Sequence, residues 1–198
     1  MQIAKRYTIE ELLEMIDEPN RSACKKLLRY NRKRFENTYG SVYNHQCWLG
    51  GYLDHIIEIM NYAILFYNAL LTTGRPLPFS LSDVLLILFL HDLEKPWKYQ
   101  RNEEGKLEVI PKMRDKNFQF EFQLKKLTQY GVTLTKNQMN GLKFVEGENH
   151  GTYNEYGRAM GELAKMCNLA DSWSARGAYQ YPLAKNDPWI GAKRCNPI

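Results

Sequence analysis

The chain has 198 residues, enough for one domain with a sizeable hydrophobic core. Hydrophobic residues make up 44% of it and charged residues 25%, with 13 Gly and 8 Pro, which excludes collagen-like, low-complexity and wholly disordered classes. The longest apolar run, residues 84–90, is too short to cross a bilayer, and the amphipathic N-terminal segment does not resemble a secretory signal. We therefore expect a single domain over residues 1–198, with no membrane partner and a cytoplasmic location.

The formal net charge is +5, a mild excess of cations that attracts anions without identifying a nucleic-acid-binding protein. Six basic residues cluster between Lys25 and Arg34. On a helix they would point around much of its circumference, so we favour a solvated face over a nucleic-acid patch. The four cysteines form no Cys-x-x-Cys pair, and we expect free thiols rather than a zinc knuckle or a disulfide framework.

Helical periodicity dominates the chain, with no repeat and no long linker. Thr8 and Glu11 form a capping-box pattern that opens a first helix, and an all-apolar segment after Ser80 indicates a buried central helix that we expect Pro96 to end. The polar segment 98–112 predicts a surface hairpin or loop. The predicted helices cover about residues 8–17, 22–37, 47–71, 80–95, 117–130, 135–145 and 153–175, with an irregular tail over 179–198. This pattern predicts an all-α fold of six to eight helices.

Histidines beside carboxylates indicate where chemistry takes place. His91 and Asp92 directly follow the apolar helix, and burying such a polar pair is costly unless it has partners. His55 lies in phase with the apolar face of its helix, and Asp171 lies in phase with Met160 on the last helix. Two histidines and two aspartates can therefore converge on a divalent ion and leave open positions for water and a phosphate oxygen. This donor set suits Mn, Fe, Co, Ni or Mg better than a closed structural zinc site.

The set His55, His91-Asp92 and Asp171 resembles the H…HD…D signature of the HD-domain superfamily. Members of this superfamily are metal-dependent phosphohydrolases with an all-α fold. Segment 44–55 resembles the His-x4-Gly-Gly-x-x-acidic-His opening of the HD domains of certain 3'→5' exoribonucleases, and segments 149–151 and 155–157 resemble that branch's His-His-Gly and Glu-aromatic-Gly motifs. The resemblance covers roughly residues 44–176. The chain has no space for that branch's oligonucleotide-binding β-barrel, and Asn149 replaces the first paired histidine. A small nucleotide substrate is therefore favoured over processive RNA degradation.

The resemblance also implies roles for individual side chains. Lys95 matches the HD-x-x-Lys variant, in which the lysine lies close to the phosphate or the attacking water. Glu94 stands beside it as a further candidate catalytic residue, and Asp92 could bridge to a second ion. His150, and less directly His45, could complete a second metal site or contact phosphate.

Other residues are candidates for contacts with substrate. Arg158 and Arg176 flank the last helix and could hold a phosphate tail. Trp97 could stack on a base, as could Tyr99 and Trp173, although core packing is the preferred interpretation for any single ring. Each of the other assignments also has a structural alternative. His91-Asp92 could be an ordinary capped helix end, and His55 and Asp171 could be hydrogen-bonded buried polar residues. Lys95 could simply extend to solvent at the end of its helix.

We therefore expect a metal-dependent phosphohydrolase that cleaves a phosphoester or phosphoanhydride of a nucleotide or deoxynucleotide, using one or two divalent ions. A 3'→5' exonuclease or cyclic-nucleotide phosphodiesterase is the alternative within the enzyme class, with a short oligonucleotide as a further substrate, and it requires an open groove. A non-catalytic nucleotide sensor or interaction module is the alternative from another class. A homo-oligomer is compatible with each of these functions.

Overall fold

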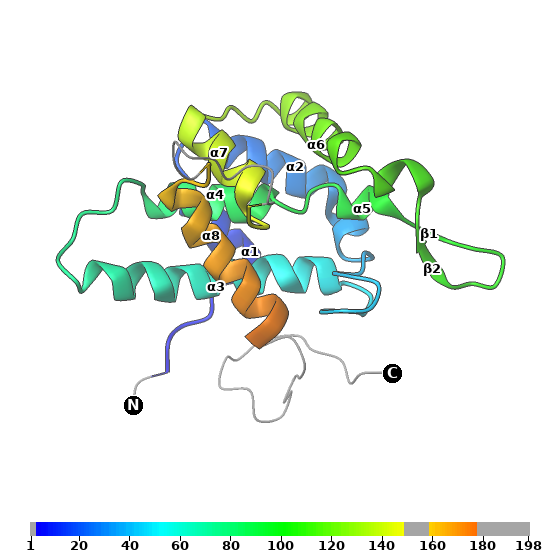
Figure 1. The fold of residues 1–198 in the computed structure, drawn as a ribbon, viewed down its shortest axis with the longest axis horizontal. Coiled ribbons are helices and arrows are strands. Elements are labelled where there is room, and N and C mark those ends of the chain that lie inside the picture. Colours follow the sequence, from blue (N-terminus) through cyan, green and yellow to red (C-terminus); the bar gives the residue numbers. More distant parts are fainter. Residues whose placement is uncertain (1–2, 149–158, 178–198) are drawn as a thin grey trace.

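The fold comes from a computed structural model that describes residues 3–148 and 159–177. It confirms the predicted all-α class: helices account for most of the described residues, and the sheet has only two strands (Figure 1). The helices are α1 (Ile9–Glu14), α2 (Asn20–Phe35), α3 (Gly51–Leu71), α4 (Leu81–Leu90), α5 (Lys95–Lys98), α6 (Lys116–Tyr130), α7 (Lys136–Phe144) and α8 (Glu162–Ser172). A 3-10 helix η1 (Pro111–Arg114) precedes α6, and a π-helical segment η3 (Trp173–Gly177) follows α8.

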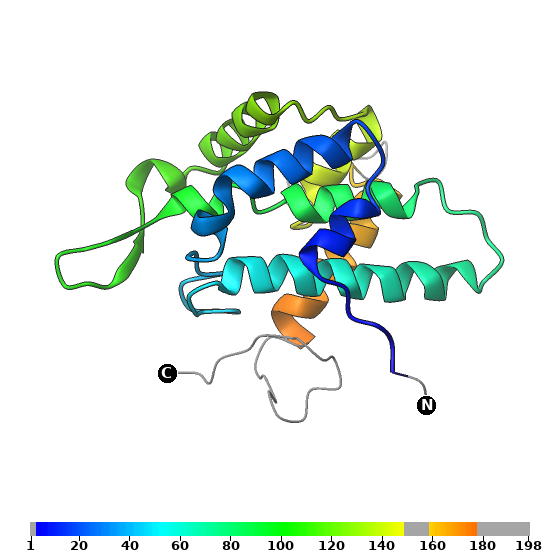
Figure 2. The same cartoon turned by 180° about the vertical axis from the view of Figure 1, so that it is seen from behind.

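Helix α4 is the centre of the hydrophobic core, as its composition predicts. Ser80 and Asp83 form a capping box at its start, and residues 84–90 are all buried. In both views of the ribbon α4 lies between α2 and α3 (Figures 1 and 2). Helices α3, α7 and α8 pack directly against it. Because α4 is surrounded by helices, its C-terminal residues are held at fixed positions inside the molecule.

The polar segment after α5 forms the predicted hairpin. Strands β1 (Tyr99–Arg101) and β2 (Leu107–Val109) pair antiparallel, with Tyr99 opposite Val109 and Arg101 opposite Leu107. Gly105 adopts a positive φ of 77° in the turn, a conformation that glycine takes without a steric penalty. The hairpin projects from one end of the molecule (Figure 1).

Helix α3 begins at Gly51, so the predicted start near residue 47 is wrong. The chain before it forms a tight loop in which Gly50 has a φ of 87° and Gln46 a φ of 44°. A Cβ atom on Gly51 would lie 2.0 Å from the Gln46 carbonyl oxygen. The loop therefore requires glycine here, and it folds Gln46 inward, where the side chain is 2% exposed.

The predicted ends of two other helices also need correction. Helix α1 ends at Glu14, because the next N–H groups bond three residues back to Leu12 and Leu13 and tighten the last turn. Helix α4 ends at Leu90, well before Pro96. Pro96 instead lies in the first turn of α5, where a missing N–H leaves no hydrogen bond unmade.

The last helix starts later than predicted. Residues 159–161 are not helical, and Gly161 is the N-cap of α8, its N–H donating to the Asn140 side chain at 2.8 Å. Met160 therefore does not share a helix with Asp171, although Ala164 and Cys167 do. The predicted helical residues 153–158 and the tail 179–198 lie outside the described residues. Within the described part of the chain, none of the helices combines the length and apolar character that a bilayer span requires.

Candidate metal centre

His91 and Asp92 lie where α4 ends inside the protein. His91 is the C-cap of α4, and the last carbonyl groups of a helix lack partners within the helix. The Gln123 side chain of α6, which is 4% exposed, donates to the Leu90 oxygen at 2.6 Å and to the His91 oxygen at 2.7 Å. This buried amide fixes the turn that presents His91 and Asp92.

His55, His91 and Asp92 form a buried cluster that could hold a metal ion, with one ligand atom from each residue and all of these atoms within 4.8 Å of one another. Among the described residues, three buried side-chain N or O atoms lack a hydrogen-bond partner, and two of them are the Nε2 atoms of His55 and His91. The third is the Tyr52 hydroxyl. Leaving buried polar atoms without partners costs about 1–3 kcal/mol each, which a bound cation would offset. The residues therefore fit a divalent ion.

The opposite edge of each imidazole is already held by a hydrogen bond. His91 Nδ1 lies 2.8 Å from the Leu88 carbonyl oxygen, so this nitrogen carries the proton. His55 Nδ1 lies 3.2 Å from the Ser174 hydroxyl. A proton on Nδ1 leaves the Nε2 lone pair free for a metal, and such outer partners commonly orient metal-binding histidines.

Asp171, in the last turn of α8, reaches the same point. Its Oδ1 atom lies 3.1 Å from His55 Nε2 and 3.6 Å from His91 Nε2, so the four predicted ligands converge from α3, α8 and the end of α4. Asp92 Oδ2 lies 3.6 Å and 3.1 Å from the same two nitrogens. Two imidazoles and two carboxylates give a mixed nitrogen and oxygen donor set, typical of catalytic rather than structural metal sites.

The charges of this cluster shift the pKa values of its members. Burial opposes ionisation of Asp171, but the imidazoles of His55 and His91 outweigh it and hold the pKa of the carboxyl well below its usual range. Burial also favours neutral His91, yet the carboxylates of Asp92 and Asp171 outweigh this effect and raise its pKa well above 6.5. Without a metal the cluster thus holds a proton in the place of a cation.

Lys95 supplies the nearest amino group. Its Nζ lies 2.5 Å from Asp92 Oδ2, and the side chain is 10% exposed. Burial alone would lower the pKa of the ammonium, but the charge of Asp92 and its hydrogen bond raise it far above the usual value. Lys95 is therefore a fixed positive charge at the edge of the metal cluster.

A polar network behind His55 includes none of the other predicted site residues. Ser174, which is fully buried, donates to Glu58 Oε2 at 2.9 Å and accepts from Gln46 Nε2 at 3.1 Å. Gln46 Nε2 also donates to Glu58 Oε2 at 2.7 Å. The chain Glu58, Ser174, His55 therefore connects a carboxylate to a metal-ligating imidazole. One signal was available: Glu58 follows His55 by three positions and so shares its helix face.

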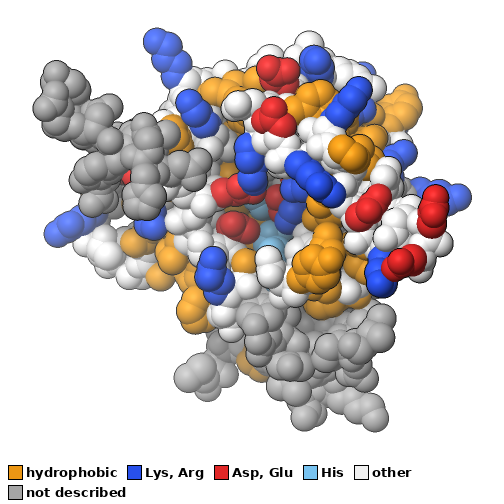
Figure 3. Space-filling view, turned by 45° about the vertical axis from the view of Figure 1, so that its right-hand side comes forward, with side chains coloured by type: hydrophobic (Ala, Val, Ile, Leu, Met, Phe, Trp, Pro, Cys, Tyr) orange, Lys and Arg blue, Asp and Glu red, His pale blue; other side chains and the backbone are white. Residues whose placement is uncertain are grey.

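The cluster opens into a cavity of about 760 Å³, called here the metal cavity. Figure 3 shows histidine side chains at the bottom of a hollow flanked by both acidic and basic groups. Two predicted substrate contacts, His45 and Arg176, line this cavity together with Lys95. The His45 ring centroid lies 4.7 Å from that of His55, and burial, then His55 and Lys95, lower the pKa of His45 to about 4. His45 is thus neutral at pH 7.

Two predicted site residues lie elsewhere. Glu94 is buried and lines an adjacent cavity of about 340 Å³ that also includes His91 and Lys116. Trp97 packs edge-on against Phe35, with ring centroids 6.3 Å apart, and does not line the metal cavity. Helix α5 directs the ring towards α2 and α6, and stacking of Trp97 on a base stays a prediction. The remaining two, His150 and Arg158, lie outside the described residues.

Comparisons with known proteins add no assignment. No protein-family model, curated protein or solved structure matches the chain.

Proposed function

We propose that this protein is a metal-dependent phosphohydrolase that acts on the phosphate groups of a nucleotide or deoxynucleotide. One observation supports this most strongly: two buried imidazole nitrogens without hydrogen bonds converge with two carboxylates in a cavity that also presents a buried lysine. A structural ion needs a closed set of ligands, whereas this cluster opens to a cavity large enough for a small ligand.

His55, His91, Asp92 and Asp171 would hold the ion. A divalent cation supplies Lewis acidity, which lowers the pKa of a coordinated water and offsets charge on a phosphate. The nitrogen and oxygen donors favour Mn, Fe, Co, Ni or Mg. A second ion is part of the proposal only through His150, which lies outside the described residues.

Other side chains would act on the phosphate directly. Lys95 keeps its positive charge at all working pH values, so it can neutralise the negative charge that develops as the phosphorus–oxygen bond breaks. Arg176 is exposed at the rim of the metal cavity and can pair with a further phosphate oxygen. His45 is neutral and can take part in hydrogen bonding without repelling the ion.

A non-catalytic nucleotide sensor is the alternative from another class. A sensor has no need of open ligand positions beside a buried lysine, and the polar network behind His55 orients a ligand more rigidly than simple binding requires. We therefore favour catalysis. Cytoplasmic location and homo-oligomerisation stay predictions.

The test is release of phosphate or pyrophosphate from a panel of ribo- and deoxynucleotides with Mn, Co, Ni or Mg added. Asp92→Ala removes a ligand, and Asp17→Ala serves as the matched control because Asp17 is exposed between α1 and α2 and does not line the metal cavity. We expect activity on one nucleotide class that Asp92→Ala abolishes and Asp17→Ala retains. No release with any nucleotide or metal, or equal activity in Asp92→Ala, would contradict the proposal.

A further inference from the structure

A second cavity, of about 830 Å³, lies between α2, α5, β1 and α6 and is called here the basic groove. Its lining contains five cations and, among the described residues, no Asp or Glu. The cations are Lys33, Arg34, Lys95, Arg101 and Lys126. A concave surface lined by one sign of charge concentrates ligands of the opposite sign.

Four of these cations have no carboxylate partner within the described chain. Arg34 donates to the Pro96 carbonyl oxygen at 3.0 Å, and Arg101 donates to the Gly105 carbonyl oxygen and the Tyr39 hydroxyl. Lys126 donates to the Gln129 amide oxygen at 3.0 Å. Lys33 takes part in none of the ion pairs of the described residues. Their positive charge is therefore available to an incoming anion.

The Trp97 ring brings two of these cations together. Lys126 Nζ lies 4.5 Å and Arg34 Cζ 5.2 Å from the ring centroid. Burial and the neighbouring Arg34 charge lower the pKa of Lys126, as expected for two cations held close without an anion. An anionic ligand in the groove would relieve this repulsion.

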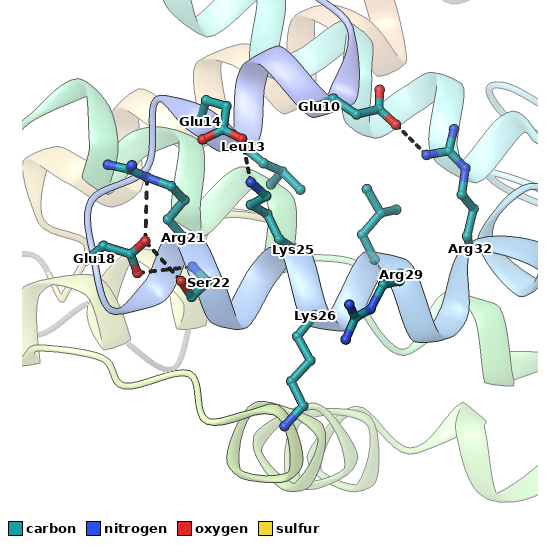
Figure 4. A pocket seen from close by; sticks show the side chains of 11 residues that line it. Glu10, Leu13, Glu14, Glu18, Arg21, Ser22, Lys25, Lys26, Arg29 and Arg32 are labelled. Carbon is teal, nitrogen blue, oxygen red and sulfur yellow. Dashed lines mark hydrogen bonds and ion pairs between the residues drawn. The ribbon is translucent and has the colours of Figure 1, made fainter.

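On the opposite face of α2, three cations lie close to carboxylates. There Lys25 pairs with Glu14 at 2.5 Å, Arg32 pairs with Glu10, and Arg21 lies 4.0 Å from Glu18 (Figure 4). All three carboxylates come from α1 or the turn after it. Lys26 and Arg29 on this face have no carboxylate partner among the described residues, so the basic groove differs in that its lining contains no Asp or Glu.

Aromatic rings line the basic groove together with the cations. Tyr30, Tyr39, Trp97, Tyr99 and Tyr130 all line it. Grooves that combine cations with aromatic side chains are typical of proteins that bind single-stranded nucleic acid, because phosphates pair with the cations and unstacked bases stack on the rings. A duplex would hide the faces of its bases from these rings.

The basic groove adjoins the metal cavity. Lys95 lines both, and its ammonium group is the one that contacts Asp92. A chain of nucleotides lying in the groove would therefore have a neighbouring phosphate within reach of the metal cluster. A mononucleotide at the metal would leave the groove empty.

We propose that the basic groove binds a single-stranded oligonucleotide and that the phosphodiester next to the bound segment is the one hydrolysed. This substrate assignment rests on the proposed phosphohydrolase function. It also assigns a ligand to Lys33 and Arg34, part of the basic cluster for which the sequence alone favours a solvated face.

The test measures binding separately from chemistry. Fluorescence anisotropy of a fluorescein-labelled single-stranded oligonucleotide is followed as salt is raised, in EDTA so that no metal contributes. The variant is Lys33→Ala/Lys126→Ala. The control is Lys26→Ala/Lys125→Ala, which removes the same charge from α2 and α6 at exposed positions outside the groove.

For a single strand, each phosphate contact contributes about 0.7 to the slope of log K against log salt. The groove variant lacks two cations, so its slope should be smaller in magnitude by about 1.4. When salt is lowered from 1 M to 0.1 M, the affinity of the groove variant should therefore rise about 25-fold less than the affinity of the wild type. The control should keep the slope of the wild type. Equal loss in both variants, equal affinity for a duplex, or equal competition by polyglutamate would overturn the inference.

Hydrolysis of mononucleotides is assayed in parallel. If mononucleotides are hydrolysed but the groove variant binds oligonucleotide as the wild type does, the groove inference fails and the phosphohydrolase stands. If oligonucleotide binding depends on the groove but nothing is hydrolysed with any metal, the proposed function fails instead.

Discussion

Replacing Ser174 with alanine tests how the structure holds His55. The hydroxyl is fully buried, accepts from His55 Nδ1 and Gln46 Nε2, and donates to Glu58. Gln46 and Glu58 keep their mutual hydrogen bond of 2.7 Å when the hydroxyl is removed. Only His55 Nδ1 therefore loses its sole partner among the described residues.

The magnitude follows from that single loss. One unsatisfied buried donor costs about 1–3 kcal/mol, so the free energy of unfolding of the metal-free protein should fall by that amount. Freed from its partner, His55 can also adopt the tautomer that places the proton on Nε2, where it blocks the metal. Loss of such an orienting partner typically weakens metal binding about 10- to 100-fold.

Competition with a metal-binding fluorescent indicator gives the affinity, and urea unfolding in EDTA gives the stability. Ser172→Ala is the matched control, since this hydroxyl makes no hydrogen bond with a described residue. We expect the control to bind metal as the wild type does. Wild-type metal affinity in Ser174→Ala, with the fold intact by circular dichroism, would refute the orienting role of the hydroxyl.

Three further changes probe the same site. Lys95→Met removes a cation beside the ligands, so metal affinity should rise in the indicator assay while the rate of phosphate release falls about 10²–10³-fold; a parallel loss of both would contradict separate roles. Because the carboxylates raise the pKa of His91 above 6.5, the metal-free protein holds a proton that the ion must displace. Metal affinity should therefore rise with pH, and calorimetric enthalpies should vary with the ionisation enthalpy of the buffer; buffer-independent enthalpies would contradict this. Below pH 6.5 that proton also stabilises the folded metal-free protein, and the stabilisation should be lost as pH rises through the raised pKa. Gly51→Ala places a Cβ atom against the Gln46 carbonyl and should cost about 1–3 kcal/mol or more in urea unfolding, whereas exposed Gly74→Asn should cost less.

Local patterns were sufficient to predict much of the fold. The capping boxes at Thr8, Ser80 and Thr135 begin helices where the sequence placed them, and the polar segment after α5 forms the hairpin. Helix phase also placed His55 on a buried face. These features depend on residues close together in the chain, which is why the sequence reveals them.

Features set by distant contacts were beyond local patterns. The end of α4 at Leu90 depends on the Gln123 amide, which comes from α6 and binds the last carbonyls. The inward fold of Gln46 depends on the space left by Gly51. The basic groove brings α2 and α6 together around Trp97, a ring for which the sequence predicted core packing or stacking on a base without indicating the groove.

Metal content tests the central claim most directly. The purified protein is loaded with Mn or Co, dialysed and analysed by atomic emission, beside Asp92→Asn, which keeps the size of the side chain and removes its charge. The account predicts at least one ion for each chain of the wild type and its loss in Asp92→Asn. Wild-type protein that retains no divalent metal, or Asp92→Asn that retains as much as the wild type, would contradict a metal centre built from His55, His91 and Asp92.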